Sequence, residues 1–311
     1  MRNGYGDCKD YVVLMQALLK AKNIDSSAVL VDWGQMYQNL PLPMASQFNH
    51  AIIYLPAFNI FANPTDKNAS FGELDASLRG KLVAIATPKG STAYTPKVTA
   101  DKNRYSMTSG IAISSDGTIN GESELKFFGS YNSSIRSSFA TDTPEEIVNR
   151  LLSKTPEGGT GTLETSNLND LDGPVTVKAK WNSPNAINAG KQIYLSTPAG
   201  IDIENPLQFR GYITYPKRLY PMVAGARDLS WEYKITIPSN YKVSNLPNNQ
   251  NFSNSAGEYT STYQAEGGYI TVKRHLVIKN DVYSPEEYPA FKELLHKPIN
   301  DVRSVMVLEK S

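Results

Sequence analysis

Three residues near the start of the chain have the types that cysteine-based catalysis requires. Cys8 is the only cysteine among 311 residues. A cysteine acts as a nucleophile when a histidine takes its proton and a third group orients that histidine. His50 and Asn63 follow in the segments FNHAIIYL and FNIFANPTD, so we predict a Cys8–His50–Asn63 triad that attacks an acyl carbon. The alternative is that Cys8 is a small buried apolar residue, as free cysteines often are.

The segment that carries Cys8 has the pattern of a helix over residues 7–22. Asp7 is a suitable N-cap, and Asp10 three residues later gives a capping-box pattern. Apolar residues then recur at helical spacing as far as Leu19. Cys8 is therefore expected in the first turn, where the helix dipole stabilises a thiolate.

The other two residues are expected on a β-hairpin. Residues 26–33 read as one strand, and residues 48–55 and 58–62 read as two more, separated by Pro56-Ala57 in a loop of two or four residues. A symmetric hairpin pairs Leu55 with Phe58 and places His50 directly opposite Asn63. Opposed side chains have Cβ atoms about 5 Å apart, within reach of a hydrogen bond between an imidazole and an amide.

Taken together, these segments resemble the bacterial transglutaminase-like superfamily, whose folds are related to papain-type cysteine peptidases. The resemblance rests on GDCKD at the start of a Leu-rich helix, on the His-Ala strand, and on the Asn-Pro-Thr strand end that stands where the family usually has Asp-Pro-Thr. The segment FGELDASLRGKLVAIATP (71–88) resembles the end of that domain. The resemblance covers about the first 88 residues.

The resemblance implies a role for each residue. Cys8 matches the family nucleophile, His50 the general base and Asn63 the orienting residue; Asp66 is a less favoured third member, because the hairpin register turns it away from His50. The reaction would be acyl transfer or hydrolysis on protein or peptide amides, by a peptidase, an amidase or a Gln–Lys cross-linking enzyme, with no cofactor. The family branch implies a periplasmic or otherwise exported protein, although no signal peptide is visible, and a domain that is incomplete at its N-terminus.

The predicted fold class is α+β, with a partial transglutaminase-like (papain-like) unit followed by β-sandwich-like, β-rich structure. The first unit would cover residues 1–90 and the β-rich accessory region residues 91–311, which divides into two units at about 91–205 and 206–311. Each of these carries one helix with a Pro-Glu-Glu start, near 144–153 and 285–296. No catalytic residue is expected from this region.

Composition excludes several other functions. The 31 basic and 30 acidic residues nearly cancel, which argues against nucleic acid as a partner. No apolar run reaches the ~20 residues that a membrane span requires. His50, His275 and His296 lack the spacing of metal ligands, so no metal site is predicted. The competing hypothesis is an inactive transglutaminase-like protein that acts as a binding or scaffolding module through its β-rich region.

Overall fold

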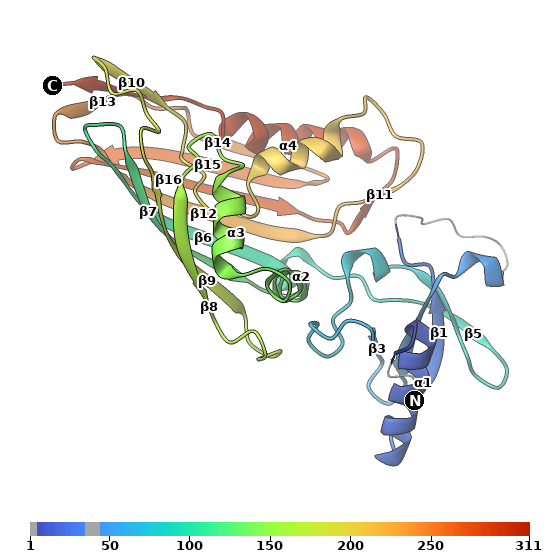
Figure 1. Cartoon of the computed structure of the whole chain (residues 1–311). Coiled ribbons are helices and arrows are strands. Elements are labelled where there is room, and N and C mark those ends of the chain that lie inside the picture. The colour runs from blue at the N-terminus through green and yellow to red at the C-terminus, as the bar shows by residue number, and fades with distance from the viewer. Residues whose placement is uncertain (1–4, 35–43) are drawn as a thin grey trace.

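Strands dominate this protein in the computed structural model, which describes residues 5–34 and 44–311 (Figure 1). Within those ranges the chain has eighteen strands in four sheets, four α-helices and four short 3-10 helices. The two larger sheets define two regions, which we call the first sheet and the large sheet.

The first sheet is antiparallel and has the strand order β3-β2-β1-β4-β5. One of its faces packs against a small core that includes Val31, Ile52 and Leu78, all fully buried. The pattern of β-branched and apolar residues that predicted strands at 26–33, 48–55 and 58–62 is confirmed by β1, β2 and β3. The five strands are β1 (Ser27–Val31), β2 (His50–Leu55), β3 (Ile60–Ala62), β4 (Leu82–Ile85) and β5 (Ser91–Tyr94).

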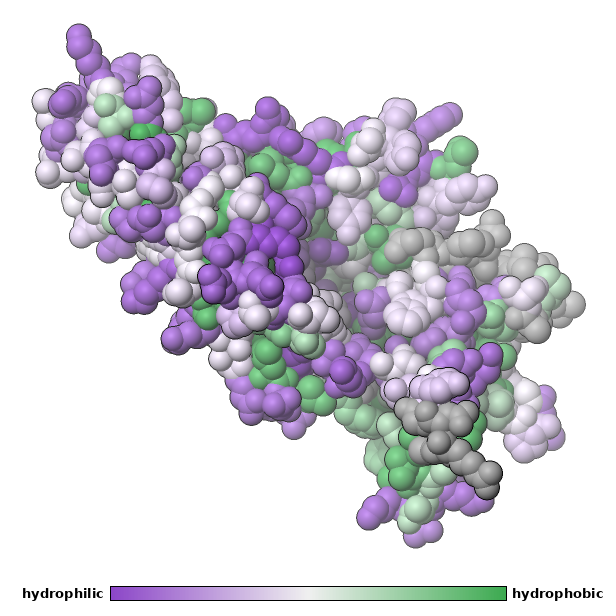
Figure 2. All heavy atoms as spheres, viewed as in Figure 1, coloured by the Kyte–Doolittle hydropathy of each residue, from purple (hydrophilic) through white to green (hydrophobic). Residues whose placement is uncertain are grey.

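The predicted helix at 7–22 is confirmed as α1 (Cys8–Ala21), which covers part of the other face of the first sheet. Met15 and Leu19 pack there against a second small core of three buried residues, Ile53, Leu55 and Ala62. The outward side of α1 is also partly apolar, and Figure 2 shows apolar (green) residues at the surface in this part of the molecule. A single helix therefore has apolar surface on both sides, as the broad apolar stripe of its sequence indicates.

The large sheet has eight strands in the order β14-β15-β16-β12-β6-β7-β9-β8. All neighbouring pairs are antiparallel except β12 and β6, which run parallel. Burial alternates along its strands, so one face is buried and the other is polar and faces solvent. The strands are β6 (Arg104–Ile113), β7 (Ile119–Phe127), β8 (Thr160–Thr165), β9 (Val175–Ser183), β12 (Arg227–Thr236), β14 (Gln250–Asn254), β15 (Gly257–Glu266) and β16 (Tyr269–Ile278).

Helices cover the buried face of the large sheet. The helix predicted near 144–153 is confirmed as α3 (Pro144–Leu152), with the Thr143 capping box in place. The helix predicted near 285–296 is α4 (Tyr288–Asp301), which begins a few residues later and packs on β14 and β15. The Ser-rich α2 (Ser130–Phe139) was not predicted, because serine is a weak helix former.

The remaining elements complete this region. Two small sheets have the orders β10-β18-β13 and β11-β17. Their strands and the short 3-10 helices are β10 (Gln192–Leu195), β11 (Met222–Val223), β13 (Tyr241–Asn245), β17 (Val282–Tyr283), β18 (Met306–Lys310), η1 (Ala45–Gln47), η2 (Ala76–Leu78), η3 (Ala100–Lys102) and η4 (Pro206–Ile213). No helix in the described ranges is long and apolar enough to cross a membrane.

The predicted fold class, an α+β chain with a papain-like unit and a β-sandwich-like region, is wrong. The described chain is β-rich throughout and shows no papain-like α/β core. The three segments that hold Cys8, His50 and Asn63 correspond to only one helix, α1, and two strands, β2 and β3. Three further strands, β1, β4 and β5, join β2 and β3 in the first sheet. The large sheet, in turn, packs mainly against helices rather than against a second large sheet (Figure 1).

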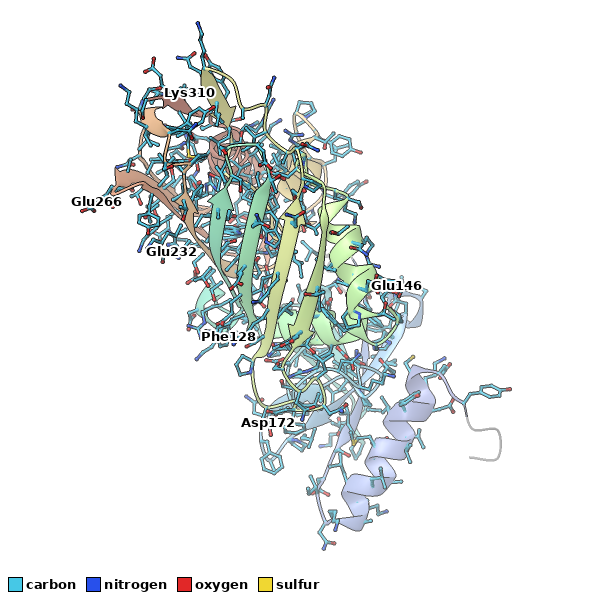
Figure 3. The ribbon with its side chains drawn as sticks, turned by 60° about the vertical axis from the view of Figure 1, so that its left-hand side comes forward. Phe128, Glu146, Asp172, Glu232, Glu266 and Lys310 are labelled. Atoms are coloured by element: carbon cyan, nitrogen blue, oxygen red, sulfur yellow. The ribbon has the colours of Figure 1, made fainter. Side chains whose placement is uncertain are left out.

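The first sheet lies beyond one end of the large sheet. Figure 3 shows Phe128 and Asp172 at the end nearer the first sheet and Lys310 at the opposite end. The predicted domain boundary near residue 90 stays a prediction, as does the division of the rest into 91–205 and 206–311. Strands from both of those ranges share the large sheet, because β6 pairs with β12.

Buried polar contacts join the two regions. The Arg79 guanidinium lies 3.2 Å from the Asp281 carboxylate, and both side chains are only 2% exposed. The same carboxylate accepts hydrogen bonds from the backbone N–H groups of Val98 and Ala226. A buried charge with this many partners is costly to disrupt, so this pair holds the segment before β4 against the large-sheet region.

Candidate active site

Cys8 is the first residue of α1, and the turn before it is tightly capped. The Asp7 carboxylate accepts hydrogen bonds from the backbone N–H groups of Lys9 (2.9 Å) and Asp10 (3.4 Å). The Asp10 carboxylate in turn accepts from the Asp7 N–H at 2.9 Å. A Cβ atom at Gly6 would lie 2.5 Å from Cβ of Asp10, so this return contact needs a glycine. The capping box thus holds a partly exposed, free thiol at the positive end of the helix.

His50 and Asn63 are in contact. Nε2 of His50 lies 3.0 Å from Oδ1 of Asn63, and both residues are buried. The predicted pairing register is wrong by two residues, because Leu55 pairs with Ile60 rather than with Phe58. The turn takes four residues and ends on Asn59, which has a left-handed backbone with φ of 51°. A shift of two residues keeps every side chain on its face, so Asn63 reaches His50 diagonally instead of directly.

Thr65 fixes the orientation of the Asn63 amide. Oδ1 of Asn63 accepts hydrogen bonds from the Thr65 hydroxyl (2.7 Å) and from the Thr65 backbone N–H (3.3 Å). A backbone N–H can only donate, so the amide atom that faces it must be the oxygen. The same oxygen faces Nε2 of His50, which must therefore carry a proton. In the neutral ring, Nδ1 is then the nitrogen with the free lone pair.

Burial keeps the His50 ring neutral. The residue is 7% exposed, and this desolvation lowers the pKa of the imidazole, with the hydrogen bond to Asn63 acting weakly in the opposite direction. The Trp33 ring lies over it, with ring centroids 4.5 Å apart and planes at 47°. A neutral imidazole whose Nε2–H is bound to an amide is a proton acceptor at Nδ1, which is the role of a general base.

The helix that carries the thiol and the His50 ring lie on different sides of β2. α1 and β2 run in the same direction, because β1 returns from the end of α1 and β2 is antiparallel to β1. Cys8 and His50 therefore lie at the same end of the first sheet. α1 packs on the face that bears Ile53 and Leu55, whereas alternation along the strand places the His50 side chain with Ile52 on the other face. No hydrogen bond joins the Cys8 thiol to His50 in the described structure.

Asp66, the less favoured third member, has other partners. One oxygen of its carboxylate accepts a hydrogen bond of 2.6 Å from the Ser133 hydroxyl of α2, and the other accepts from the backbone N–H of Asn68. Asp66 therefore joins the segment after β3 to the large-sheet region. The structure brings Asn63, and not Asp66, against the His50 ring.

Sequence reasoning missed two neighbours of this pair. Thr65 stands two residues after Asn63, and an Asn side chain in a turn commonly accepts a hydrogen bond from the backbone N–H two residues on. Trp33 ends the strand predicted at 26–33, and only the pairing of β1 with β2 shows that it reaches His50. The first could have been found from the Asn-Pro-Thr sequence, but the second could not.

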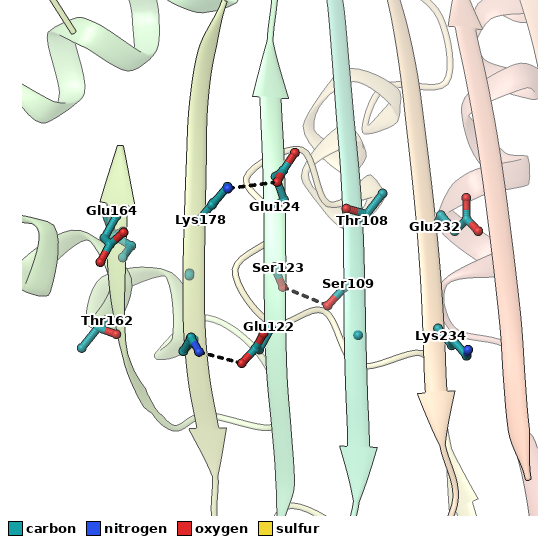
Figure 4. Close-up of a pocket in the computed structure, with 14 residues that line it drawn as sticks. Thr108, Ser109, Glu122, Ser123, Glu124, Thr162, Glu164, Lys178, Glu232 and Lys234 are labelled. Carbon is teal, nitrogen blue, oxygen red and sulfur yellow. Dashed lines mark hydrogen bonds and ion pairs between the residues drawn. The ribbon is translucent and has the colours of Figure 1, made fainter. Parts of the chain in front are cut away.

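A shallow hollow of about 700 Å³ lies elsewhere, on the solvent face of the large sheet (Figure 4). Two of its glutamates are paired: Glu122 lies 2.9 Å from Lys180, and Glu124 lies 3.7 Å from Lys178. In all, four glutamates and three lysines line the hollow, so its net charge is small. Among the described residues, no three His, Cys, Asp or Glu side chains cluster as metal ligands would.

Comparison with known proteins places the chain near others of similar fold. A domain of unknown function with a solved structure (DUF3858) matches residues 193–308, which lie in the large-sheet region and exclude all three predicted triad residues. No curated protein sequence matches the chain. A crystal structure from Parabacteroides distasonis, described as a "putative protease", is similar with a TM-score of 0.52 and 14% identity. The match covers 99% of this chain and 45% of the other, so this chain spans less than half of that protein, and the likeness shows the fold alone.

Proposed function

We propose that this chain carries a transglutaminase-like site for cysteine-dependent acyl transfer or hydrolysis on protein or peptide amides. Cys8 is the nucleophile, His50 the general base and Asn63 the residue that orients the imidazole. The observation that carries the proposal is the buried, neutral His50, whose Nε2–H is held by Asn63 and whose Nδ1 is left as the proton acceptor. The description of the similar structure as a "putative protease" points to the same reaction class.

The proposed chemistry follows from these groups. The Cys8 thiol gives its proton to Nδ1 of His50, and the thiolate attacks the acyl carbon of an amide. The imidazolium returns the proton to the departing nitrogen as the C–N bond breaks, which leaves a thioester on Cys8. Water or an amine then resolves the thioester, which gives hydrolysis or cross-linking. In the described structure α1 and the His50 ring lie on different faces of β2, so this proton transfer requires the thiol and the ring to move towards each other.

Alkylation of the thiol tests the proposal without knowledge of the substrate. We expect iodoacetamide to modify Cys8 rapidly at neutral pH, and the rate to fall by roughly tenfold or more in His50→Ala, because the proton acceptor is lost. Asn63→Ala should reduce the rate less, since the amide orients the ring without supplying the base. His275→Ala is a matched control, because His275 is also a strand histidine with a side-chain partner, and it should leave the rate unchanged.

Turnover is the second arm of the experiment. A mixture of peptide amides, with and without an added primary amine, should release ammonia or peptide fragments with the wild-type chain and not with Cys8→Ser. A thiol that reacts slowly at every pH and is indifferent to His50 would contradict the proposal. It would favour the alternative, an inactive protein that acts as a binding or scaffolding module through its β-rich region.

A further inference from the structure

The loop after β1 holds an aromatic ring against the proposed base. Trp33 is 44% exposed, yet its ring lies over His50 at a centroid distance of 4.5 Å. An ordered side chain that is about half exposed loses conformational freedom with few packing contacts to offset the loss, so hydrogen bonds to its backbone help to hold it in place. The anchors lie just before β2 and β4, the two strands that flank β1.

The first anchor is Asn49, the residue that precedes His50. Its Oδ1 accepts a hydrogen bond of 2.7 Å from the Trp33 backbone N–H, and its Nδ2 donates to the Trp33 carbonyl at 3.0 Å. One amide side chain therefore forms hydrogen bonds with both the N–H group and the carbonyl of Trp33, much as a neighbouring strand would. Because Asn49 directly precedes His50 in the chain, these two hydrogen bonds hold the Trp33 backbone next to the residue that carries the proposed base.

The second anchor is Lys81, which lies just before β4. Its side chain is only 3% exposed, and its ammonium group donates a hydrogen bond of 2.9 Å to the carbonyl of Gly34 and lies 3.7 Å from the Asp32 carboxylate. Asp32 also accepts a hydrogen bond of 3.1 Å from Nδ2 of Asn49. Asp32 and Gly34, on either side of Trp33, thus both contact Lys81 just before β4. The two charged groups of this network, the Lys81 ammonium and the Asp32 carboxylate, face each other.

From this network we infer that Trp33 is a positioning residue for His50, held in place by Asn49 and Lys81, and that it shields the His50–Asn63 hydrogen bond from water. The inference rests on the proposed function, in which His50 is the general base. Removing water from a hydrogen bond strengthens it and disfavours the charged form of the ring. The lowered pKa of His50 agrees with such shielding.

The test is to follow the protonation of His50 by NMR in the full chain, with isotope-labelled histidine. The chain has three histidines, and a His50→Gln sample assigns the signal. In Trp33→Ala we expect the pKa of His50 to move up towards its ordinary value, with faster exchange of the Nε2 proton, because water reaches the ring. Trp33→Phe keeps an aromatic ring there and should retain most of the lowered pKa.

Asn49→Ala separates positioning from charge. Asn49 is neutral, so its loss changes the anchoring of Trp33 without removing a charge. Lys81→Met would remove a positive charge together with an anchor, and each of these changes raises the pKa of a nearby histidine. We expect Asn49→Ala to raise the pKa of His50 in the same direction as Trp33→Ala. Tyr94→Ala, which removes an exposed aromatic ring from the same sheet, is the control and should change nothing.

The outcomes are distinct from those of the proposed function. An unchanged His50 titration and proton exchange in both Trp33→Ala and Asn49→Ala would overturn this inference, whatever the reactivity of Cys8. Conversely, Cys8 alkylation that ignores His50 would overturn the proposed function, even if Trp33 does shield the ring.

Discussion

The two β regions each place a histidine against one side-chain partner, with opposite results. In the first sheet, Nε2 of His50 lies 3.0 Å from Asn63, and burial lowers the pKa of the ring. In the large sheet, Nε2 of His275 lies 2.8 Å from Asp228, and this hydrogen bond raises the pKa of the ring. The distances are nearly equal, so the difference comes from the charge of the partner and from solvent exposure.

The comparison shows how its surroundings set the protonation of a strand histidine. His275 stands on the solvent face of the large sheet, with its side chain 43% exposed, and a carboxylate there stabilises the imidazolium as part of a surface ion pair. His50 is enclosed and has a neutral amide, which orients the ring without stabilising its charge. The amide of Asn63 therefore leaves the neutral form of His50 favoured, and in that form the ring can accept a proton.

The largest expected effect comes from giving His50 a carboxylate partner like that of His275. Asn63→Asp places a carboxylate about 3 Å from a buried imidazole, and an opposite charge at this range raises a histidine pKa by roughly 1–3 units. The protonated fraction of His50 at neutral pH should therefore rise. Histidine NMR titration measures this change, and an unaltered His50 curve would mean that the contact with Asn63 does not exist in solution.

The reverse exchange should have a smaller effect. Asp228→Asn removes the carboxylate from His275, and we expect its pKa to fall towards its ordinary value of 6.5. The change should be smaller than at His50 and should shrink further in high salt, because an exposed pair is screened. Glu258→Gln, a more distant contributor to the same pKa, serves as the control and should shift the titration less than Asp228→Asn.

The pH dependence of stability should separate the two histidines by sign. The pKa of His50 is lowered on folding, so the unfolded chain binds more protons there and His50 costs stability as the pH falls below about 6.5. The pKa of His275 is raised, so its contribution is fully present below about 6.5 and is lost as the pH rises through the folded-state value.

Urea denaturation between about pH 5 and pH 8 measures both contributions. In the His50→Gln variant, the free energy of unfolding should rise less with pH than in the wild type, and in the His275→Gln variant it should rise more. Equal slopes in all three proteins would show that neither histidine changes its proton affinity on folding.

The smallest effect is expected from the support of the Asn63 amide. Thr65→Val removes the hydroxyl donor to Oδ1 but keeps the backbone N–H, so the amide should stay in place with one hydrogen bond fewer. A part-buried hydrogen bond contributes about 1 kcal/mol, and we expect a loss of that order in the free energy of unfolding. Thr65→Ser retains the donor and should lose less, and equal losses in the two variants would show that the hydroxyl is not the reason.

The sequence by itself determined the local elements and the residues of the proposed site. The capping pattern around Asp7 places Cys8 at a helix start, and the Thr-Pro-Glu-Glu start places α3, because both patterns depend on contacts within four residues. The strands that carry His50 and Asn63 follow from β-branched and apolar runs for the same reason. The alternation of side chains between the two faces of a strand is also a local property. His50 and Asn63 therefore lie on the same side of the sheet, even though the predicted register was wrong.

Only the tertiary structure decided the rest, because the deciding contacts join residues far apart in the chain. The parallel pairing of β6 with β12 connects segments more than a hundred residues apart, and the same applies to the helices that cover the large sheet. The fold class was wrong because a motif of three short segments says nothing about such pairings. At the site, the contacts of Trp33 with His50, of Lys81 with Gly34 and of Asp66 with Ser133 exist only once strands and helices have docked. Docking also buries His50, and burial, which no single segment encodes, is what lowers its pKa.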